Sequence, residues 1–400
     1  MIKRIGMLTS GGDCQALNAT MRGVVKGLSN NLDELEVYGF DDGYKGLIYG
    51  KYRMLTSKDF SGILTQGGTI LGTSRQPFKL MRVPDENGLD KVEAMKQTYY
   101  KLCLDCLVIL GGNGTQKTAN LLREEGLNII HLPKTIDNDL AVTDHTPGYG
   151  SAAKYIASTM KEIIRDALVQ PIKIVNIIEI MGRNAGWLTA ASALAKGDDC
   201  EGVDLIYLPE TVFDINKFVA KVQEIQKTKK QIVVAVSEGV KTADGKYVCE
   251  SASSNMLVDS FGHKQLSGTA SALANVISNE IGCKTRAIEF STIQRCASHI
   301  ASLTDVNEAF IVGGIAVKAA FDGETGKVGI FQRLSNKPYL MGTSIYDVNA
   351  IANVEKTVPQ EWIINDGTGV SQEALDYMRP LIQGEIYPYM VDGLPRHIKL

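Results

Sequence analysis

Short apolar runs alternate with longer amphipathic stretches along most of this chain. The runs "RIGML" (4–8), "LDCLVIL" (104–110) and "LNIIHL" (127–132) have the length and composition of buried strands. The first two lead through glycine-rich turns into helical patterns at about 16–27 and 116–126. Strands that alternate with helices are typical of βαβ units, so we expect the chain to fold around a mostly parallel sheet.

The same alternation starts again after a helix predicted by "GYGSAAKYIASTMKEIIRDAL". Further buried strands are predicted by "IVNIIEI" (174–180), "DLIYL" (204–208) and "QIVVAVS" (231–237). The segment "EAFIVGGIAVKAAF" (308–321) reads as a long buried helix. We therefore predict an α/β protein with two similar three-layer α/β/α sandwich domains, mostly parallel sheets and a C-terminal extension, divided near 145–150.

Composition argues against two classes of partner. The chain has 400 residues and a net charge of -3, so it lacks the basic balance that nucleic-acid binding usually needs. No apolar run approaches the roughly 20 residues of a membrane span. The N-terminus enters a predicted strand directly, without a secretory signal. We expect neither nucleic acid nor membrane as a partner.

Seven scattered cysteines indicate a reducing, cytoplasmic setting, because an odd and sparse set does not suit a disulfide framework. Cys103 and Cys106 form one CxxC, but no second pair stands at zinc-ribbon spacing. The histidines form no HExxH pattern. Structural thiols are expected, and catalytic zinc is not.

Three glycine-rich loops predict phosphate binding. "TSGGD" (9–13) and "GGNGT" (111–115) each join a predicted strand to a helix, and "QGGTILGTSR" (66–75) ends in Arg75. Glycines let backbone N–H groups close on phosphate oxygens, and a helix N-terminus adds a favourable dipole. Each loop alone is more often only a tight turn. Neither a P-loop nor a Rossmann GxGxxG motif occurs at these positions.

The loop "PKTIDND" (133–139) crowds charged groups after an apolar strand. Asp137 can accept the proton of a substrate hydroxyl, and Asp139 can hold a metal ion. Lys134 can face a migrating phosphoryl group, and Thr135 can hydrogen-bond to it. An Asx-turn with a helix cap is the alternative interpretation of this loop.

Three arginines each follow an apolar strand pattern: Arg183, Arg286 and Arg295. Guanidinium groups that converge can grip a phosphate bidentately. A single arginine is more often a surface ion-pair partner, so the three carry weight only together.

Eight motifs resemble, in order, those of the phosphofructokinases. They cover roughly residues 1–345 and read "LTSGGDCQALNATMRGV", "GYKGL", "GGTILGTSR", "LGGNGTQKTANLL", "PKTIDNDL", "EIMGRNAGWL", "VAVSEG" and "TRAIEFSTIQR". The resemblance implies a glycolytic enzyme that phosphorylates the C1 hydroxyl of fructose 6-phosphate. It also implies a donor domain at 1–148 completed by about 296–347, a sugar-phosphate domain at 149–295 and an extension at 348–400.

The resemblance further implies a role for single residues. Asp137 resembles the catalytic base, with Lys134 and Thr135 beside it. The sugar phosphate would contact Thr135, Asp137, Met181, Gly182, Arg183, Glu238, Arg286 and Arg295, one of the last two arginines reaching in from a neighbouring subunit. The donor would contact Gly11, Arg75, Gly112, Gly114 and Thr115, and magnesium (Mg2+) would be held by Asn113 and Asp139.

The phosphoryl donor depends on two positions. Pyrophosphate-using relatives typically carry aspartate where this chain has Gly114, and lysine where it has Lys134. Gly114 leaves room for a nucleotide and favours ATP, and some ATP-using relatives also combine this glycine with lysine. Asp41 and Gln76 stand where well-known ATP-using members hold aromatic residues, and Asn113 replaces an acidic metal ligand with a neutral amide.

The leading hypothesis is an ATP-dependent 6-phosphofructokinase. The main alternative is a pyrophosphate-dependent fructose 6-phosphate 1-phosphotransferase. A non-catalytic regulatory subunit that binds a sugar phosphate is a third hypothesis, motivated by Asn113. A kinase of another substrate is a fourth, because similar loops occur in lipid and NAD kinases, which lack "MGR". A homodimer or homotetramer is expected from the resemblance.

Overall fold

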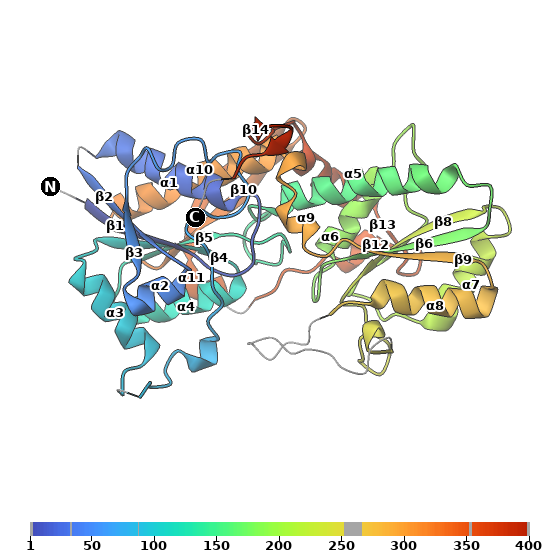
Figure 1. Ribbon diagram of the computed structural model, residues 1–400, viewed down its shortest axis with the longest axis horizontal. Helices are drawn as coiled ribbons and strands as arrows, with labels where there is room; N and C mark the ends of the chain where they lie inside the picture. Colours follow the sequence, from blue (N-terminus) through green and yellow to red (C-terminus); the bar gives the residue numbers. More distant parts are fainter. Residues whose placement is uncertain (1–2, 33, 87, 252–265, 352–353, 398–400) are drawn as a thin grey trace.

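The two main β-sheets lie one after the other along the longest axis of the chain (Figure 1), and the described residues form two further sheets of two strands each. The computed structural model describes residues 3–32, 34–86, 88–251, 266–351 and 354–397. The first sheet takes its strands from both ends of the described chain, and the second takes its strands from the middle.

The first sheet has seven strands in the order β11-β10-β5-β4-β1-β2-β3. Its inner pairs are parallel, and the edge strands β3 and β11 run antiparallel to their neighbours. The strands are β1 (Lys3–Thr9), β2 (Leu35–Phe40), β3 (Tyr52–Leu55), β4 (Cys106–Gly111), β5 (Ile129–Pro133), β10 (Lys327–Asn336) and β11 (Tyr339–Asp347).

Helices cover both faces of this sheet. One face carries α1 (Leu17–Asn31) and α10 (Leu303–Phe321). The other carries α2 (Tyr44–Tyr49), α3 (Lys91–Lys101) and α4 (Asn113–Glu124). A Cβ atom on Gly23 of α1 would lie 2.0 Å from the Phe310 carbonyl oxygen of α10. The glycine therefore allows the two helices to pack backbone against backbone, which explains why α10 can be buried so deeply.

The second sheet has four parallel strands in the order β7-β8-β6-β9. Strand β6 is buried along its whole length, as expected for a central parallel strand rich in Val and Ile. The strands are β6 (Ile174–Ile180), β7 (Leu205–Tyr207), β8 (Gln231–Ser237) and β9 (Lys284–Glu289). The covering helices are α5 (Tyr149–Leu168) and α6 (Trp187–Ala190) on one face, and α7 (Ile215–Ile225) and α8 (Thr269–Ile281) on the other.

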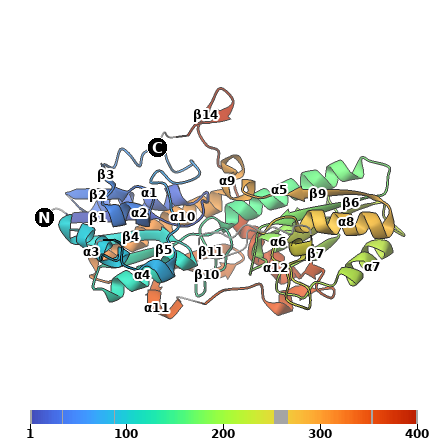
Figure 2. The ribbon, with the colours of Figure 1, turned by 60° about the horizontal axis from the view of Figure 1, so that its bottom comes forward.

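The C-terminal segment packs back across the molecule. It holds α11 (Val348–Ile351), β12 (Ile363–Ile364), β13 (Gly369–Val370), α12 (Gln372–Met378), β14 (Met390–Val391) and β15 (Leu394–Pro395), and it follows the short helix α9 (Ile293–Cys296) and α10. The Ile206 amide of β7 donates to the Thr368 carbonyl (2.9 Å), and the Ser302 hydroxyl donates to the Leu381 carbonyl (2.7 Å). The β14–β15 hairpin projects from the body (Figure 2).

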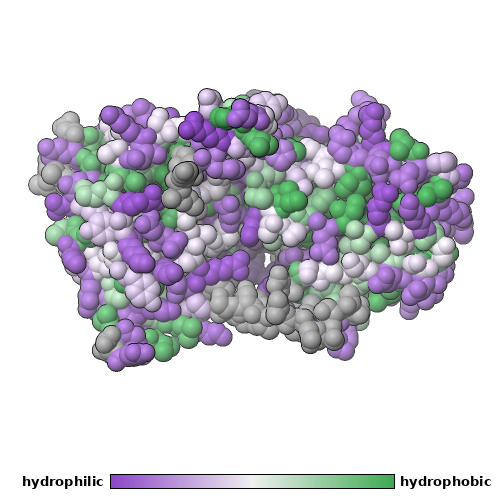
Figure 3. Space-filling model, viewed as in Figure 1, coloured by the Kyte–Doolittle hydropathy of each residue, from purple (hydrophilic) through white to green (hydrophobic). Residues whose placement is uncertain are grey.

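The predicted α/β class with two sandwiches and mostly parallel sheets is confirmed. The exact domain boundaries and the role of each half stay predictions. The face seen in Figure 3 is mainly hydrophilic, with small apolar patches between polar residues. In the part of the chain that the structure describes, no helix is both long and apolar enough to cross a bilayer.

Candidate active site

A pocket of about 380 Å³ lies where the carboxyl ends of strands from both sheets meet. Its walls come from the loops after β1, β4 and β5 of the first sheet and after β6 and β8 of the second. This is the place where open α/β sheets bind ligands. Fourteen of the sixteen predicted site residues line it; Gly182 and Arg286 do not.

The loop after β1 turns through Gly11, whose φ of 91° is a conformation that favours glycine. A Cβ atom at this position would also lie 3.3 Å from the Lys134 ammonium. The Thr73 hydroxyl donates to the Gly11 carbonyl (2.8 Å), which ties the 66–75 loop to the 9–13 loop. Arg75, at the end of that second loop, is exposed and lines the pocket. Two of the predicted phosphate loops therefore meet at one wall.

The third glycine-rich loop opens α4. Asn113 is the first residue of that helix, and its side-chain oxygen is buried without a hydrogen-bond partner. Gly112 and Thr115 line the pocket on either side of it. No atom lies within 4 Å of a Cβ atom built on Gly114, so a side chain there would point into open space.

Asp137 and Thr135 lie on the loop that follows β5. The Thr135 hydroxyl donates to an Asp137 carboxylate oxygen and accepts from the Asp137 amide, both at 3.1 Å. Burial raises the pKa of Asp137, and the Thr135 hydroxyl and nearby Lys134, Arg295 and Arg75 act against that rise. A carboxylate with a raised pKa beside cations is suited to act as a general base.

Lys134 is almost fully buried, with 3% of its surface exposed. Its ammonium donates to the Gly12 carbonyl, and burial lowers its pKa. Lys134 therefore lines the pocket and also holds the 9–13 loop through a hydrogen bond to its backbone. Asp13 lies beside it; burial raises the pKa of that carboxyl, and Lys134 and Arg295 oppose the rise.

The residues predicted to hold a metal fit a hard cation. Asp139 lines the pocket, and burial followed by repulsion from Asp137 and Glu355 raises its pKa to about 7. A bound cation would relieve that repulsion. The orphaned amide oxygen of Asn113 is a second hard ligand on the same pocket. Among the described residues, no three His, Cys, Asp or Glu side chains gather as a metal cluster, so phosphate and water would have to complete the shell.

The second sheet contributes Met181 and Arg183 after β6 and Glu238 after β8. Gly182 does not line the pocket; its amide faces a Glu238 carboxylate oxygen at 3.4 Å and so links the two loops. Burial raises the pKa of Glu238 to about 8. The loops therefore offer a permanent cation and a carboxyl whose protonated form is favoured by burial.

The three arginines do not converge within one chain. Arg295 on α9 lines the pocket, and a Cβ atom on Gly12 would lie 3.2 Å from its guanidinium. Arg286 is the third residue of β9 rather than its end, so the predicted strand-end position is wrong. Its guanidinium pairs with Asp166 near the end of α5 at 2.8 Å. The pocket of the same chain lies beyond the carboxyl end of β9, whereas Arg286 lies in the first half of that strand.

Tyr44 is a pocket residue that the sequence pattern did not indicate, although it belongs to the quoted "GYKGL". It is 1% exposed, and its hydroxyl donates to the Thr115 carbonyl (2.9 Å). Asp41, named as standing in an aromatic position, does not line this pocket and pairs with Arg53 at 2.8 Å. An aromatic residue two positions before the "GL" pair would have been the sequence signal for this pocket residue.

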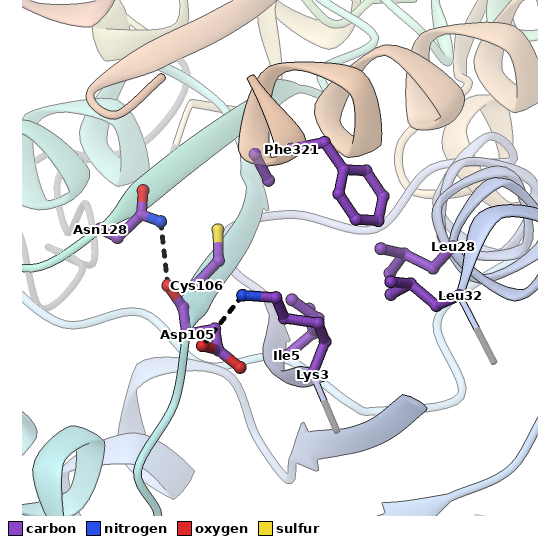
Figure 4. A pocket seen from close by; sticks show the side chains of 9 residues that line it. Lys3, Ile5, Leu28, Leu32, Asp105, Cys106, Asn128 and Phe321 are labelled. Atoms are coloured by element: carbon purple, nitrogen blue, oxygen red, sulfur yellow. Dashed lines mark hydrogen bonds and ion pairs between the residues drawn. The ribbon is translucent and has the colours of Figure 1, made fainter. Parts of the chain in front are cut away.

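A smaller cavity of about 90 Å³ lies at the opposite, amino-terminal edge of the first sheet (Figure 4). The Lys3 ammonium meets Asp105 there at 3.4 Å, and apolar side chains from α1 and α10 close the other side. All seven cysteines are free, in agreement with structural thiols. Cys106 on β4 is buried, whereas Cys103 is exposed.

Comparison with known proteins gives consistent results. Residues 4–291 match the family model described as Phosphofructokinase. The chain is 33% identical over 401 residues to the pyrophosphate–fructose 6-phosphate 1-phosphotransferase of Halomonas elongata, covering 98% of this chain and 94% of that protein. It is 36% identical over 361 residues to ATP-dependent 6-phosphofructokinase 2 of Streptomyces coelicolor, covering 90% and 97%.

Among solved structures, the pyrophosphate-dependent phosphofructokinase of Nitrosospira multiformis has a TM-score of 0.87 to this chain at 30% identity, covering 99% of this chain and 96% of that one. Similar proteins therefore carry names that specify either of two phosphoryl donors.

Proposed function

This chain belongs to the phosphofructokinase family of phosphotransferases, and we propose that it transfers the γ-phosphoryl group of ATP to the C1 hydroxyl of fructose 6-phosphate. One observation carries the proposal. A single pocket joins the glycine loops of the first sheet, the Asp137 loop and two arginines that reach it from the other half of the chain. Such a pocket can hold a donor polyphosphate and a sugar phosphate face to face.

In the proposed reaction, the Asp137 carboxylate takes the proton of the C1 hydroxyl. The freed oxygen forms a bond to the γ-phosphorus, and the bond from that phosphorus to the β–γ bridging oxygen breaks, so ADP leaves with the electron pair. Thr135 holds Asp137 in place through its two hydrogen bonds. Arg183 and Arg295 are proposed to bind the 6-phosphate, and Met181 and Glu238 to position the sugar.

Magnesium would be held by Asp139 and the Asn113 amide oxygen, and when bound it neutralises charge on the donor phosphates. The chain's own groups do the rest. Gly11, Gly112 and Thr115 offer backbone and hydroxyl donors, and the exposed Arg75 offers a charge that neighbouring phosphates can use. Lys134 keeps the first loop in place through the Gly12 carbonyl.

ATP is favoured over pyrophosphate as donor because Gly114 leaves open space at the pocket wall. Tyr44 and the first turns of α4 line the same part of the pocket. The alternative donor, pyrophosphate, is supported by Lys134 and by the names of several relatives.

A coupled assay decides between the donors. The purified chain is given fructose 6-phosphate and Mg2+ with either ATP or pyrophosphate, and product fructose 1,6-bisphosphate is measured. We expect turnover with ATP; turnover with pyrophosphate alone would replace the first choice of donor by the second. A correctly folded preparation that is inert with both, yet binds the sugar phosphate, would instead support the regulatory-subunit hypothesis.

Two further features are proposed on the same basis. The protein is expected to act as a homodimer or homotetramer, because Arg286 lies outside its own pocket and would have to serve another subunit. The seven free cysteines favour the cytoplasm as its setting.

A further inference from the structure

The ammonium of Lys356, a residue of the C-terminal extension, contacts the loop that carries Asp137 and Asp139. The ammonium donates to the Asn138 side-chain oxygen (3.2 Å) and to the carbonyls of Thr143 (3.3 Å) and Asp144 (2.5 Å). An ammonium has three N–H donors, so all three are used on this loop. The acceptors are neutral oxygens, which means that the contact fixes geometry rather than forming a simple ion pair.

The lysine is itself held firmly. Its carbonyl accepts from the indole N–H of Trp187 (2.9 Å), and its ammonium lies 5.1 Å from the centre of a Trp187 ring and 5.9 Å from that of Tyr377. Burial lowers its pKa to about 8, although Asp144 and Asp139 favour the charged form. Both distances are short enough for cation–π attraction, which helps to hold the Lys356 ammonium near the two rings.

The backbone of the same segment is tied to the metal-binding part of the loop. The Lys356 amide donates to the Asp139 carbonyl (2.8 Å), and Glu355 forms an antiparallel bridge with Leu140. The extension is therefore joined to the loop by an isolated antiparallel bridge and one further backbone hydrogen bond. Asp139, whose side chain faces the pocket, has its main chain fixed from the opposite side.

Asn138 is the residue on which these contacts meet. It is fully buried, and its φ of 54° lies in the left-handed region, which asparagine adopts more readily than most residues with a side chain. Besides Lys356, its side chain binds the Thr146 amide (3.1 Å) and the Tyr377 hydroxyl (3.0 Å). The Tyr377 hydroxyl also donates to the Asp144 carbonyl (2.5 Å). Two separate parts of the extension, at Lys356 and Tyr377, thus bind the side chain of Asn138, which stands between Asp137 and Asp139.

We propose that Lys356, with Tyr377, is a positioning residue for the reaction, and that the C-terminal extension serves to hold Asp137 and Asp139 at the pocket. The proposal rests on the proposed function, because it takes Asp137 as the base and Asp139 as a metal ligand. Neither Lys356 nor Tyr377 lines the pocket, so both act through Asn138 and the loop backbone. Partners behind a metal ligand typically change activity or metal affinity about 10- to 100-fold when lost.

The test compares Lys356→Met with the control Arg379→Met, which removes the same charge from an exposed site of the same extension. We expect Lys356→Met to lower kcat about 10- to 100-fold and to raise the Mg2+ concentration for half-maximal activity, with the KM for fructose 6-phosphate changed less than about twofold. Arg379→Met should behave as the unaltered protein. Equal kcat in both variants would overturn the proposal.

A readout that needs no turnover separates this idea from the proposed function. Hydrogen–deuterium exchange of the peptide spanning 135–146 should be about tenfold faster in Lys356→Met, because a charge-assisted hydrogen bond is lost. Exchange in β6 should stay unchanged. If the unaltered protein turns over neither donor, the proposed function fails, while the exchange result still decides whether the extension holds the loop.

Tyr377→Phe covers the case in which Lys356→Met does not fold. It removes one oxygen atom, and with it the bonds to Asn138 and Asp144, while keeping the ring. It should produce the same pattern to a smaller degree: a lower kcat, a higher requirement for Mg2+ and faster exchange in 135–146. A kcat and an exchange rate equal to those of the unaltered protein would contradict the proposal.

Discussion

At the scale of single residues, Asp137 is the side chain that the proposed reaction requires as its general base. Asp137→Asn keeps the size of the side chain but removes the base. We expect kcat to fall about 100- to 10,000-fold with little change in the KM for fructose 6-phosphate, because the base acts in the transition state. Steady-state kinetics with both substrates varied would measure this. The control Asp105→Asn alters an exposed carboxylate at the opposite edge of the sheet; a kcat for Asp137→Asn equal to that control would remove Asp137 from its role.

Gly114 is the residue on which the choice of donor is argued. Gly114→Asp adds a carboxylate in open space, so the variant should fold. A charge about 4 Å from a nucleotide phosphate costs about 1 to 4 kcal/mol, depending on the local dielectric. We therefore expect kcat/KM for ATP to fall about 10- to 1,000-fold.

The matched variant Gly114→Asn has the same size without the charge. It should retain most of the activity with ATP that Gly114→Asp loses. If both variants turn over ATP as fast as the unaltered protein, neither size nor charge at this position sets the donor.

At the scale of elements, a buried polar cluster links the loop after β5 to α10 and β10. The His145 ring bonds to Asp144 at 2.9 Å and to Glu308 at 2.8 Å, and it stacks on Phe331 with ring centres 4.6 Å apart. Asp144 is also paired with Arg333 at 2.9 Å. Burial lowers the pKa of His145, but the two carboxylates outweigh it and leave the pKa above its usual value.

This cluster predicts a pH-dependent stability. Since the folded-state pKa of His145 is raised, its contribution is complete below the unfolded pKa of about 6.5 and is lost as pH rises through the folded value. His145→Gln should therefore reduce the free energy of unfolding more at pH 6 than at high pH. Urea unfolding at several pH values measures it, with the exposed His299→Gln as control. A loss that is equal at every pH would show that folding does not change the pKa of His145.

Most central strands could be predicted from the sequence, and the edge strands of the first sheet could not. Strands β1, β4, β5 and β6 are almost wholly buried, so their apolar runs stand out. Strand β10 is buried only in its first half and ends in polar residues, and no residue of β11 is fully buried, so no long apolar run marks them. The loops after the central strands were correctly placed at one site because parallel strands bring their carboxyl ends together.

What the sequence did not reveal about the site depends on contacts between distant segments. Lys356 lies 218 residues from Asn138, and nothing in the pattern near "VEKTV" links the two. Arg286 was misplaced because β9 begins before the apolar residues that follow it, which puts the arginine inside the strand. Tyr44 was missed because a buried aromatic in a short helix looks like an ordinary core residue.

At the scale of the whole molecule, the position of Arg286 requires a second subunit if the arginine binds the 6-phosphate. It lies three residues before the end of β9, about 10 Å along the strand, and its side chain faces α5. Its own pocket begins beyond that strand end, where Met181 and Glu238 follow the neighbouring strands. We therefore expect that Arg286, if it binds the 6-phosphate, does so in the pocket of a neighbouring chain.

Mixing two impaired variants tests this arrangement. Asp137→Asn lacks the base, and Arg286→Ala lacks the arginine proposed to be shared, so each homo-oligomer should be poorly active at low fructose 6-phosphate. In a hybrid, the pocket of the Arg286→Ala chain keeps Asp137 and receives Arg286 from the other chain. The two variants are mixed in mild denaturant, so that they exchange subunits, and are then reassembled. In a random mixture, half of the chains carry Asp137, and half of the neighbours of those chains carry Arg286. The mixture should therefore regain up to about a quarter of the activity of the unaltered protein. Activity that never exceeds the sum of the two separate variants would show that Arg286 acts within its own chain, or has no part in binding the sugar phosphate.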